Sequence, residues 1–265
     1  MRPLLLLACV LAARAHGATP EPSKGCRTGD LAPAVGERQE VAGRTVLLDT
    51  PAAPADRPLP LIIAFHGFQS SPDDLRAGTN LAALTRSQQA VVAYPEGHDG
   101  VELLGTRGRG WDLRPDQTTD RDFVRRLLDR LEADRCIDRR RIYATGFSNG
   151  GFVASLLGCQ LAGRFAAVAA VSGGLDLGAC APSRPVPMLF IYGTGDRVVP
   201  ADLVRRAVDW WVARNRCGGS GTGEGCTRWT GCAADVAACE GTQEHRWPPD
   251  ATDRIGRFFA DHPGS

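Results

Sequence analysis

The pentapeptide Gly146-Phe147-Ser148-Asn149-Gly150 carries the most specific chemical signal in the chain. It follows an apolar run rich in β-formers at 141–145 and precedes a helix-compatible run at 151–157. A serine between a strand and a helix, with glycine two residues away on each side, is typical of a nucleophile elbow. In that turn the backbone is so tight that the serine hydroxyl is exposed. A glycine-rich turn gives the same pattern by chance, so Ser148 as a nucleophile requires a base and an acid elsewhere in the sequence.

The base must be a histidine that comes late in the chain. A serine hydroxyl attacks a carbonyl group when a base removes its proton and an acid orients that base. In a sequence with such an elbow, the serine comes first, the acid second and the histidine last. Of the five histidines, only His245 and His262 follow a suitable acid, and His262 lies in the C-terminal tail, where order is uncommon. We predict His245 as the base; the alternative is a solvated loop histidine.

The acid is predicted from its place after a strand. Asp196 follows the apolar run 188–192 through Gly193-Thr194-Gly195, at the carboxyl end of an expected buried strand. Loops at that end of the strands carry the functional groups of open α/β sheets. Asp202 and Asp209 belong to the following helix, where a solvated position is expected, and Asp176 remains the alternative acid.

A tetrahedral intermediate also needs two preorganised N–H donors for its oxyanion. We expect one from the backbone of Asn149, directly after the serine, and the other from Phe68 in the loop that follows an early strand. His66 in that loop is interpreted as a structural residue. Trp111 and Trp247 are candidates for lining an acyl or sugar pocket, although aromatic residues are as often part of a core.

The elements that must position these residues alternate between strand and helix. Apolar runs predict strands at 41–48, 59–65, 90–94, 141–145, 165–171, 186–192 and 236–239, and apolar periodicity predicts helices at 120–133, 203–212 and 251–260. The alternation predicts an α/β fold with a mainly parallel sheet and helices on both faces. The glycine-rich segment 217–225 is expected to be a surface loop.

The N-terminus has the features of a secretory signal peptide at residues 1–17. Arg2 precedes an apolar stretch from Leu4 to Ala13, which is too short to span a bilayer, and small residues offer cleavage sites near Ala15. Secretion, extracellular or periplasmic, is therefore expected. The run ending at Cys9 faintly resembles a lipoprotein box, which leaves lipid anchoring as a minor alternative. Residues 18–40 are expected to form a tether, and 41–265 a single catalytic domain.

The number of cysteines predicts a disulfide-bonded protein. Eight of the nine cysteines follow the leader, an even number that suggests up to four disulfides, with Cys217, Cys226, Cys232 and Cys239 stapling their own segment. No spacing typical of a zinc site is present, so we expect no metal and no cofactor.

The net charge of the mature chain is expected to be close to zero. Removal of the expected signal peptide would take away two arginines and no acidic residues, which leaves 29 basic and 30 acidic residues. This balance gives no reason to expect a nucleic-acid partner, and no membrane association is expected. The oligomeric state stays open.

Five motifs in order resemble the polyhydroxybutyrate depolymerase and feruloyl/acetylxylan esterase family of secreted α/β-hydrolases. They are His66-Gly67, Tyr94–Gly97, Arg141–Gly151, Gly193–Pro200 and His245–Pro248. The resemblance covers most of residues 55–260 and implies an α/β-hydrolase fold with Ser148 as nucleophile, Asp196 as acid and His245 as base. One departure is Thr242-Gln243-Glu244, where the family usually has glycines. A carboxylate at Glu244 beside the base would raise the pKa of His245 or narrow the acyl pocket.

We therefore predict a secreted serine carboxylic-ester hydrolase that acts through an acyl-enzyme. The resemblance implies hydroxyalkanoate esters, or feruloyl and acetyl esters of plant polysaccharide, and we expect a small or oligomeric ester rather than crystalline polymer. Two alternatives remain. One is a serine peptidase of the prolyl-oligopeptidase type, and the other is a catalytically inactive secreted binding protein that keeps the hydrolase fold.

Overall fold

A computed structural model of the chain describes residues 19–27, 34–51, 58–103, 105–114, 116 and 118–264. The expected signal peptide at 1–17 lies outside the described residues, so it stays a prediction. In the described part of the chain, no helix is both long enough and apolar enough to cross a membrane.

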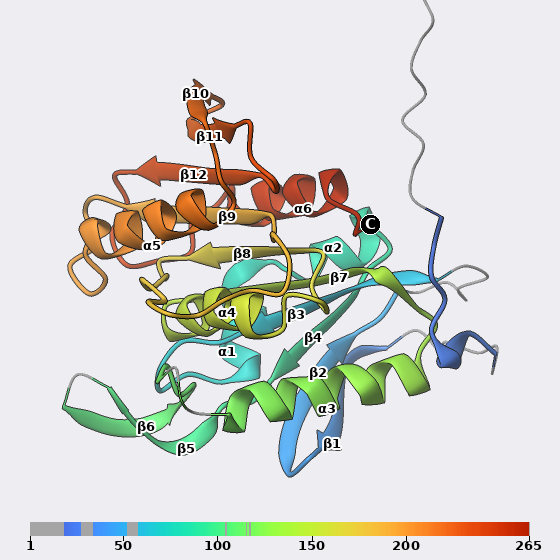
Figure 1. Ribbon diagram of the computed structural model, residues 1–265. Coiled ribbons are helices and arrows are strands. Elements are labelled where there is room, and N and C mark those ends of the chain that lie inside the picture. The colour runs from blue at the N-terminus through green and yellow to red at the C-terminus, as the bar shows by residue number, and fades with distance from the viewer. Residues whose placement is uncertain are drawn as a thin grey trace, which may run out of the picture.

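The fold is built on one sheet of ten strands (Figure 1), in the order β1-β2-β4-β3-β7-β8-β9-β12-β11-β10. The six central strands pair in parallel, and an antiparallel hairpin extends each edge. The central strands are β4 (Val91–Pro95), β3 (Leu59–Phe65), β7 (Ile137–Phe147), β8 (Ala167–Val171), β9 (Met188–Gly193) and β12 (Val236–Gly241). The edge hairpins are β1 (Val35–Val41) with β2 (Arg44–Asp49), and β10 (Gly219–Gly223) with β11 (Cys226–Thr230). The predicted mainly parallel sheet is confirmed.

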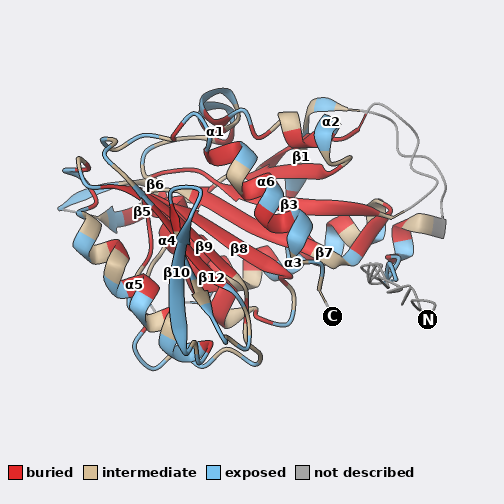
Figure 2. Cartoon of the chain, turned by 90° about the horizontal axis from the view of Figure 1, so that it is seen from above, coloured by how far each residue is buried: buried red, intermediate tan, exposed pale blue. Residues whose placement is uncertain are grey.

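Helices cover both faces of this sheet because its central strands are apolar on both sides. In β3, Leu61, Ile63 and Phe65 point to one layer, while Ile62 and Ala64 point to the other. The first layer holds α3 (Thr119–Asp134), α4 (Asn149–Gln160) and α5 (Ala201–Arg214). The second holds α1 (Pro72–Thr79), α2 (Ala83–Ser87) and α6 (Ala251–Asp261). Figure 2 shows the buried strands enclosed between these helices.

Two hairpins differ from the predicted elements. The single strand expected at 41–48 is confirmed from Arg44 onward, where it is β2. A turn at Ala42-Gly43 separates Val41, the last residue of β1, from β2, and both turn residues have positive φ (51° and 79°). The glycine-rich segment expected as a surface loop contains β10, which pairs with β11 and is exposed along its whole length. A further hairpin, β5 (His98–Leu103) with β6 (Thr106–Gly110), lies outside the main sheet.

The segment expected as an N-terminal tether is partly built into the fold. β1 crosses the boundary expected near residue 41 and pairs with β2, so 35–40 form an edge strand rather than a tether. The short 3-10 helix η1 (Lys24–Arg27) follows the buried Ser23, whose N–H donates to the carbonyl of Ile137 at 2.8 Å. Cys26 in η1 is bonded to Cys136 at the start of β7.

All eight cysteines after the leader form disulfides: Cys26–Cys136, Cys159–Cys180, Cys217–Cys232 and Cys226–Cys239. The last two staple the segment that carries the β10–β11 hairpin to its own flanks, as predicted. The first closes a separation of 110 residues and the third a separation of only 15.

The lengths of these loops predict different contributions to stability. Replacing Cys26 and Cys136 together by Ala should lower the free energy of unfolding by about 5 kcal/mol. A disulfide that closes a long loop removes more entropy from the unfolded chain than one that closes a short loop. The matched double replacement of Cys217 and Cys232 should cost about 3 kcal/mol. Guanidinium unfolding under non-oxidising, non-reducing conditions measures both. An equal loss, or a larger one for the short loop, would contradict the chain-entropy account.

Candidate active site

Ser148 occupies a strained turn between β7 and α4 (Figure 1). Its backbone has φ 55° and ψ −121°, a region that non-glycine residues seldom enter. Two hydrogen bonds fix it there: the N–H of Ser148 donates to the carbonyl of Val171 at 2.9 Å, and Phe152 donates to the carbonyl of Ser148 at 2.9 Å. The turn therefore holds the serine at the carboxyl edge of the sheet.

Glycine is required on both sides of Ser148 because neighbouring backbone fills the space. A Cβ atom on Gly150 would overlap the carbonyl group of Phe65 at the end of β3. A Cβ atom on Gly146 would overlap the carbonyl group of Gly150 itself. The pattern read from the sequence thus has a packing cause, the close approach of the elbow to the adjacent strand.

The structure brings Ser148, His245 and Asp196 together. The Nε2 atom of His245 lies 3.0 Å from the Oγ atom of Ser148, and its Nδ1 atom lies 2.7 Å from Oδ2 of Asp196. Since a carboxylate only accepts, Nδ1 carries the proton and Nε2 is left to accept from the serine hydroxyl. The side chain of Asp196 is 1% exposed and that of His245 is 18% exposed.

The Asp196 carboxylate is held by its own loop. Its Oδ1 atom accepts hydrogen bonds from the N–H groups of Val198 at 2.9 Å and Val199 at 2.8 Å. The other oxygen is left for His245, so both oxygens are satisfied although the group is buried.

The acid and base loops meet because β9 and β12 are parallel neighbours. Gly193 at the end of β9 pairs with Gly241 at the end of β12, and Thr194 donates from its N–H to the carbonyl of Gly241 at 2.9 Å. A Cβ atom on Gly193 would overlap the carbonyl group of Gln243. The glycines before Asp196 therefore let the loop that carries His245 lie directly against them.

Aromatic rings support the imidazole from one side. The ring of Phe147 lies 4.8 Å from that of His245, and Trp247 packs edge-on against Phe147 with ring centroids 6.5 Å apart. The indole N–H of Trp247 donates to Thr252 at 3.1 Å. Trp247 therefore packs against the ring that supports His245. A contact between Trp247 and substrate stays a prediction.

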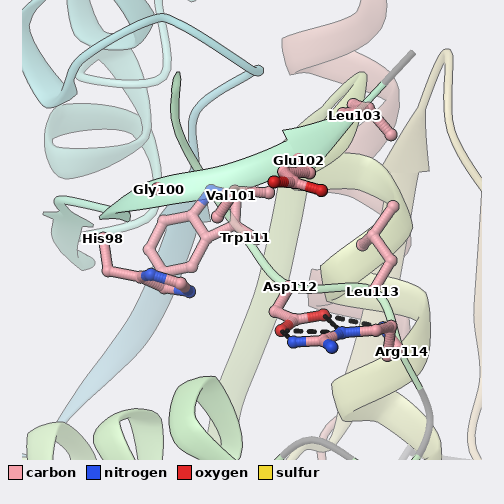
Figure 3. A pocket seen from close by; sticks show the side chains of 9 residues that line it. All are labelled: His98, Gly100, Val101, Glu102, Leu103, Trp111, Asp112, Leu113 and Arg114. Atoms are coloured by element: carbon pink, nitrogen blue, oxygen red, sulfur yellow. Dashed lines mark hydrogen bonds and ion pairs between the residues drawn. The ribbon is translucent and has the colours of Figure 1, made fainter. Parts of the chain in front are cut away.

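Trp111, predicted to line a substrate pocket, is fully buried, and a contact between its side chain and substrate stays a prediction. A cavity of about 710 Å³ lies between β5 and the segment 111–114, with Trp111 in its wall (Figure 3). The tryptophan side chain is nevertheless 0% exposed, because it packs edge-to-face on Phe65 with ring centroids 5.0 Å apart. None of Ser148, Asp196 and His245 lines this cavity.

The predicted oxyanion donors belong to two segments that lie beside the serine. Asn149 is the first residue of α4, so its N–H has no acceptor within the helix. The loop that leads to Phe68 passes beside the nucleophile: a Cβ atom on Gly67 would lie 3.6 Å from that of Ser148. Both segments therefore lie at the turn that carries Ser148, and the donor role of the two N–H groups stays a prediction.

The side chain of Asn149 has a role that the sequence did not reveal. Its Oδ1 atom accepts from the N–H of Trp111 at 2.7 Å, and its Nδ2 group donates to the carbonyl of Trp111 at 3.0 Å. The pairing of an amide with both backbone groups of one residue has no sequence signature, because the partner is 38 residues away.

The other candidates take part in separate contacts. The carboxylate of Glu244 is 75% exposed and pairs with Arg246 at 2.7 Å. Asp176 is exposed and accepts from the N–H of Gly178, Asp202 pairs with Arg205, and His262 pairs with Asp235. Within the described ranges, no three His, Cys, Asp or Glu side chains are grouped so as to hold a metal ion.

His66 is fully buried, in agreement with the structural role predicted for it. Burial lowers the pKa of its imidazole below the usual value. Its Nε2 atom accepts from the N–H of Gly97 at 2.9 Å, so the proton is on Nδ1, which lies 2.7 Å from the carbonyl oxygen of Gly67.

Comparison with known proteins places this site in a family. The family model described as Esterase PHB depolymerase matches residues 45–218. Feruloyl esterase B of Piromyces equi is 34% identical over 164 residues, which cover 59% of this chain and 30% of that protein. Probable feruloyl esterase C of Aspergillus terreus is 28% identical over 241 residues, 83% of this chain and 85% of that protein. The chain spans less than half the length of several curated relatives that it matches.

A solved structure has the same fold at low sequence identity. The acetyl xylan esterase from Aspergillus awamori superposes with a TM-score of 0.66 over 85% of this chain and 99% of that chain, at 13% identity. Identity at that level supports the shared fold alone.

The packing at the elbow predicts a contrast between two glycines. Replacing Gly150 by Ala should lower the free energy of unfolding by about 3 kcal/mol, because backbone of β3 must move to admit the methyl group. Gly78 in α1 is the matched control: a methyl group there meets no atom within 4 Å, and Gly78→Ala should stabilise by about 0.5–1 kcal/mol. Denaturant unfolding of both variants measures the contrast, and a neutral Gly150→Ala would show that the elbow is not tightly packed.

Proposed function

The protein belongs to the esterase PHB depolymerase family, and from this membership and the geometry of the site we propose that it hydrolyses carboxylic esters through a serine acyl-enzyme. One observation carries the proposal. The Ser148 hydroxyl lies 3.0 Å from a histidine nitrogen whose partner nitrogen lies 2.7 Å from a buried carboxylate. This is the arrangement that activates a serine for acyl transfer.

The first half-reaction forms the acyl-enzyme. The Oγ atom of Ser148 attacks the ester carbonyl carbon while its proton passes to Nε2 of His245. The carbonyl oxygen becomes an oxyanion that the N–H groups of Phe68 and Asn149 stabilise. As the carbon–oxygen ester bond breaks, the proton on His245 passes to the leaving alcohol.

The second half-reaction repeats these steps with water. His245 accepts a proton from a water molecule that attacks the acyl carbon, and the same two N–H groups stabilise the second oxyanion. The bond to Ser148 then breaks, and the serine takes back the proton while the carboxylic acid leaves. Throughout, Asp196 holds the imidazole in the required tautomer and stabilises its charged form.

The substrate class is inferred from the relatives. We infer a small or oligomeric ester, either a feruloyl or acetyl ester of plant polysaccharide or a hydroxyalkanoate ester. The names of the matched relatives, feruloyl esterases among them, support the first group, and the family name supports the second.

The protein is proposed to act outside the cytoplasm. Four disulfides persist where the surroundings are oxidising, and the two that flank the β10–β11 hairpin are in a glycine-rich part of the chain with little apolar core of its own. This agrees with the signal peptide expected at the N-terminus.

Removing the nucleophile tests the mechanism. Ser148→Ala should lower kcat/KM for p-nitrophenyl acetate by at least about 10⁴-fold, because the variant lacks the hydroxyl that forms the acyl-enzyme. A fluorophosphonate probe should label the wild-type protein and not the variant. Ser220→Ala, in the exposed strand β10, is the control and should keep full activity. A folded wild-type protein that resists the probe would favour the inactive binding protein.

The substrate class is tested by comparing esters directly. We expect kcat/KM to be highest for one of methyl ferulate, acetylated xylan and short hydroxybutyrate oligomers, each assayed by release of the free acid with Ser148→Ala as the blank. Cleavage of a peptide amide with none of these three would instead favour the serine peptidase.

A further inference from the structure

Trp111 connects the two segments that supply the oxyanion donors. Its backbone N–H and carbonyl pair with the Asn149 amide at 2.7 Å and 3.0 Å, and its indole N–H donates to the carbonyl of His66 at 2.9 Å. Asn149 begins α4, whereas His66 follows β3. Trp111 therefore hydrogen-bonds to both segments at once.

All three residues are fully buried. Trp111, His66 and Asn149 are each 0% exposed, so water does not compete for these hydrogen bonds. Hydrogen bonds of buried groups are costly to leave unmade, and a network that is fully satisfied is rigid. The link is therefore stiff enough to set the relative positions of the two backbone segments.

His66 transmits this position to the first donor. Its Nδ1–H donates to the carbonyl of Gly67 at 2.7 Å. That carbonyl and the N–H of Phe68 belong to one planar trans peptide, in which they point in opposite directions. Holding the carbonyl toward the imidazole thus fixes the direction in which the Phe68 N–H points.

Trp111 is itself anchored from both sides along the chain. Before Trp111 in the chain, β6 lies against the loop 66–69, which we call the oxyanion loop. The N–H of Gln69 donates to the carbonyl of Arg109 at 2.8 Å. After it, the N–H of Asp112 donates to Asp120 at 2.7 Å, and that carboxylate pairs with the nearly buried Arg44 at 2.7 Å. The tryptophan cannot shift without disturbing these contacts.

We propose that Trp111 is a positioning residue that, through the Asn149 side chain and the His66 carbonyl, holds the two oxyanion donors at the separation that the transition state needs. The proposal rests on the esterase function proposed above and adds a role for Trp111 that requires no contact with substrate. It predicts that loosening this link weakens binding of the transition state more than binding of the substrate.

The test removes one hydrogen bond at each of two equivalent tryptophans. Trp111→Phe removes the indole N–H that His66 accepts. Trp211→Phe is the matched control, because Trp211 is also 0% exposed and donates its indole N–H to a buried group, Ser155 at 3.0 Å, away from the oxyanion loop. Both variants should lose similar thermal stability, which sets the purely structural effect of the change.

Kinetics then separate positioning from stability. For Trp111→Phe we expect kcat on p-nitrophenyl acetate to fall at least about tenfold with KM within about twofold, and affinity for a trifluoromethyl ketone to fall in parallel. Trp211→Phe should keep both within about twofold. Asn149→Ala, which retains the Asn149 N–H but loses both side-chain bonds to Trp111, should reproduce the Trp111→Phe pattern.

The outcomes distinguish this proposal from the one on which it rests. Equal kinetics and inhibitor affinity for Trp111→Phe and Trp211→Phe, with Ser148→Ala inactive, would overturn the positioning role and leave the esterase mechanism intact. A fully active Ser148→Ala would instead overturn the esterase mechanism itself.

Discussion

The close packing of backbone around Ser148 is the constraint on which the rest of the site depends. The elbow lies where β3, β7 and β8 end side by side, with Phe65 paired to Gly146 and Val171 paired to Phe147. A serine at positive φ costs about 1–3 kcal/mol, and it persists only where surrounding structure determines it fully. Here the hydrogen bond to Val171 and the absence of space for a Cβ atom at the flanking glycines leave the backbone no alternative.

The acid and the base reach Ser148 because the parallel sheet continues in one direction. β9 and β12 follow β8 in order, so their carboxyl ends lie on the same edge as the elbow. The loops after them deliver Asp196 and His245, and the glycines at 193 and 195 allow those loops to touch. A site of three side chains from distant parts of the chain thus follows from strand order and from four places where only glycine fits, at 146, 150, 193 and 195.

The sequence predicted the parts of the fold whose signal lies in one segment. Central strands such as β3 are buried on both faces and therefore appear as continuous apolar runs, and Ser148, Asp196 and His245 each stand directly after such a run or in a late loop. The hairpins were missed because their sequences lack that signal. β10 is Gly-Ser-Gly-Thr-Gly and β6 is Thr-Arg-Gly-Arg-Gly, and their pairing is set by the neighbouring strand rather than by apolar alternation. The strand expected at 41–48 is right from Arg44 to Leu48. Only its start is wrong, because a turn at Ala42-Gly43 separates Val41 from β2.

Trp111 shows why the rest of the site could not be predicted in this way. Its type is equally suited to a pocket and to a core, and only its three hydrogen bonds to Asn149 and His66 distinguish the two. The proposed oxyanion donors are backbone N–H groups, which every residue except proline possesses, so no side chain at their own positions marks them. What marks them is the buried side chains that hold those peptides in place, and these come from residues 38 and 45 positions apart in the chain. For a site of this kind, therefore, the sequence indicates which groups react, whereas the separation between the groups that stabilise the transition state is a property of the packed structure.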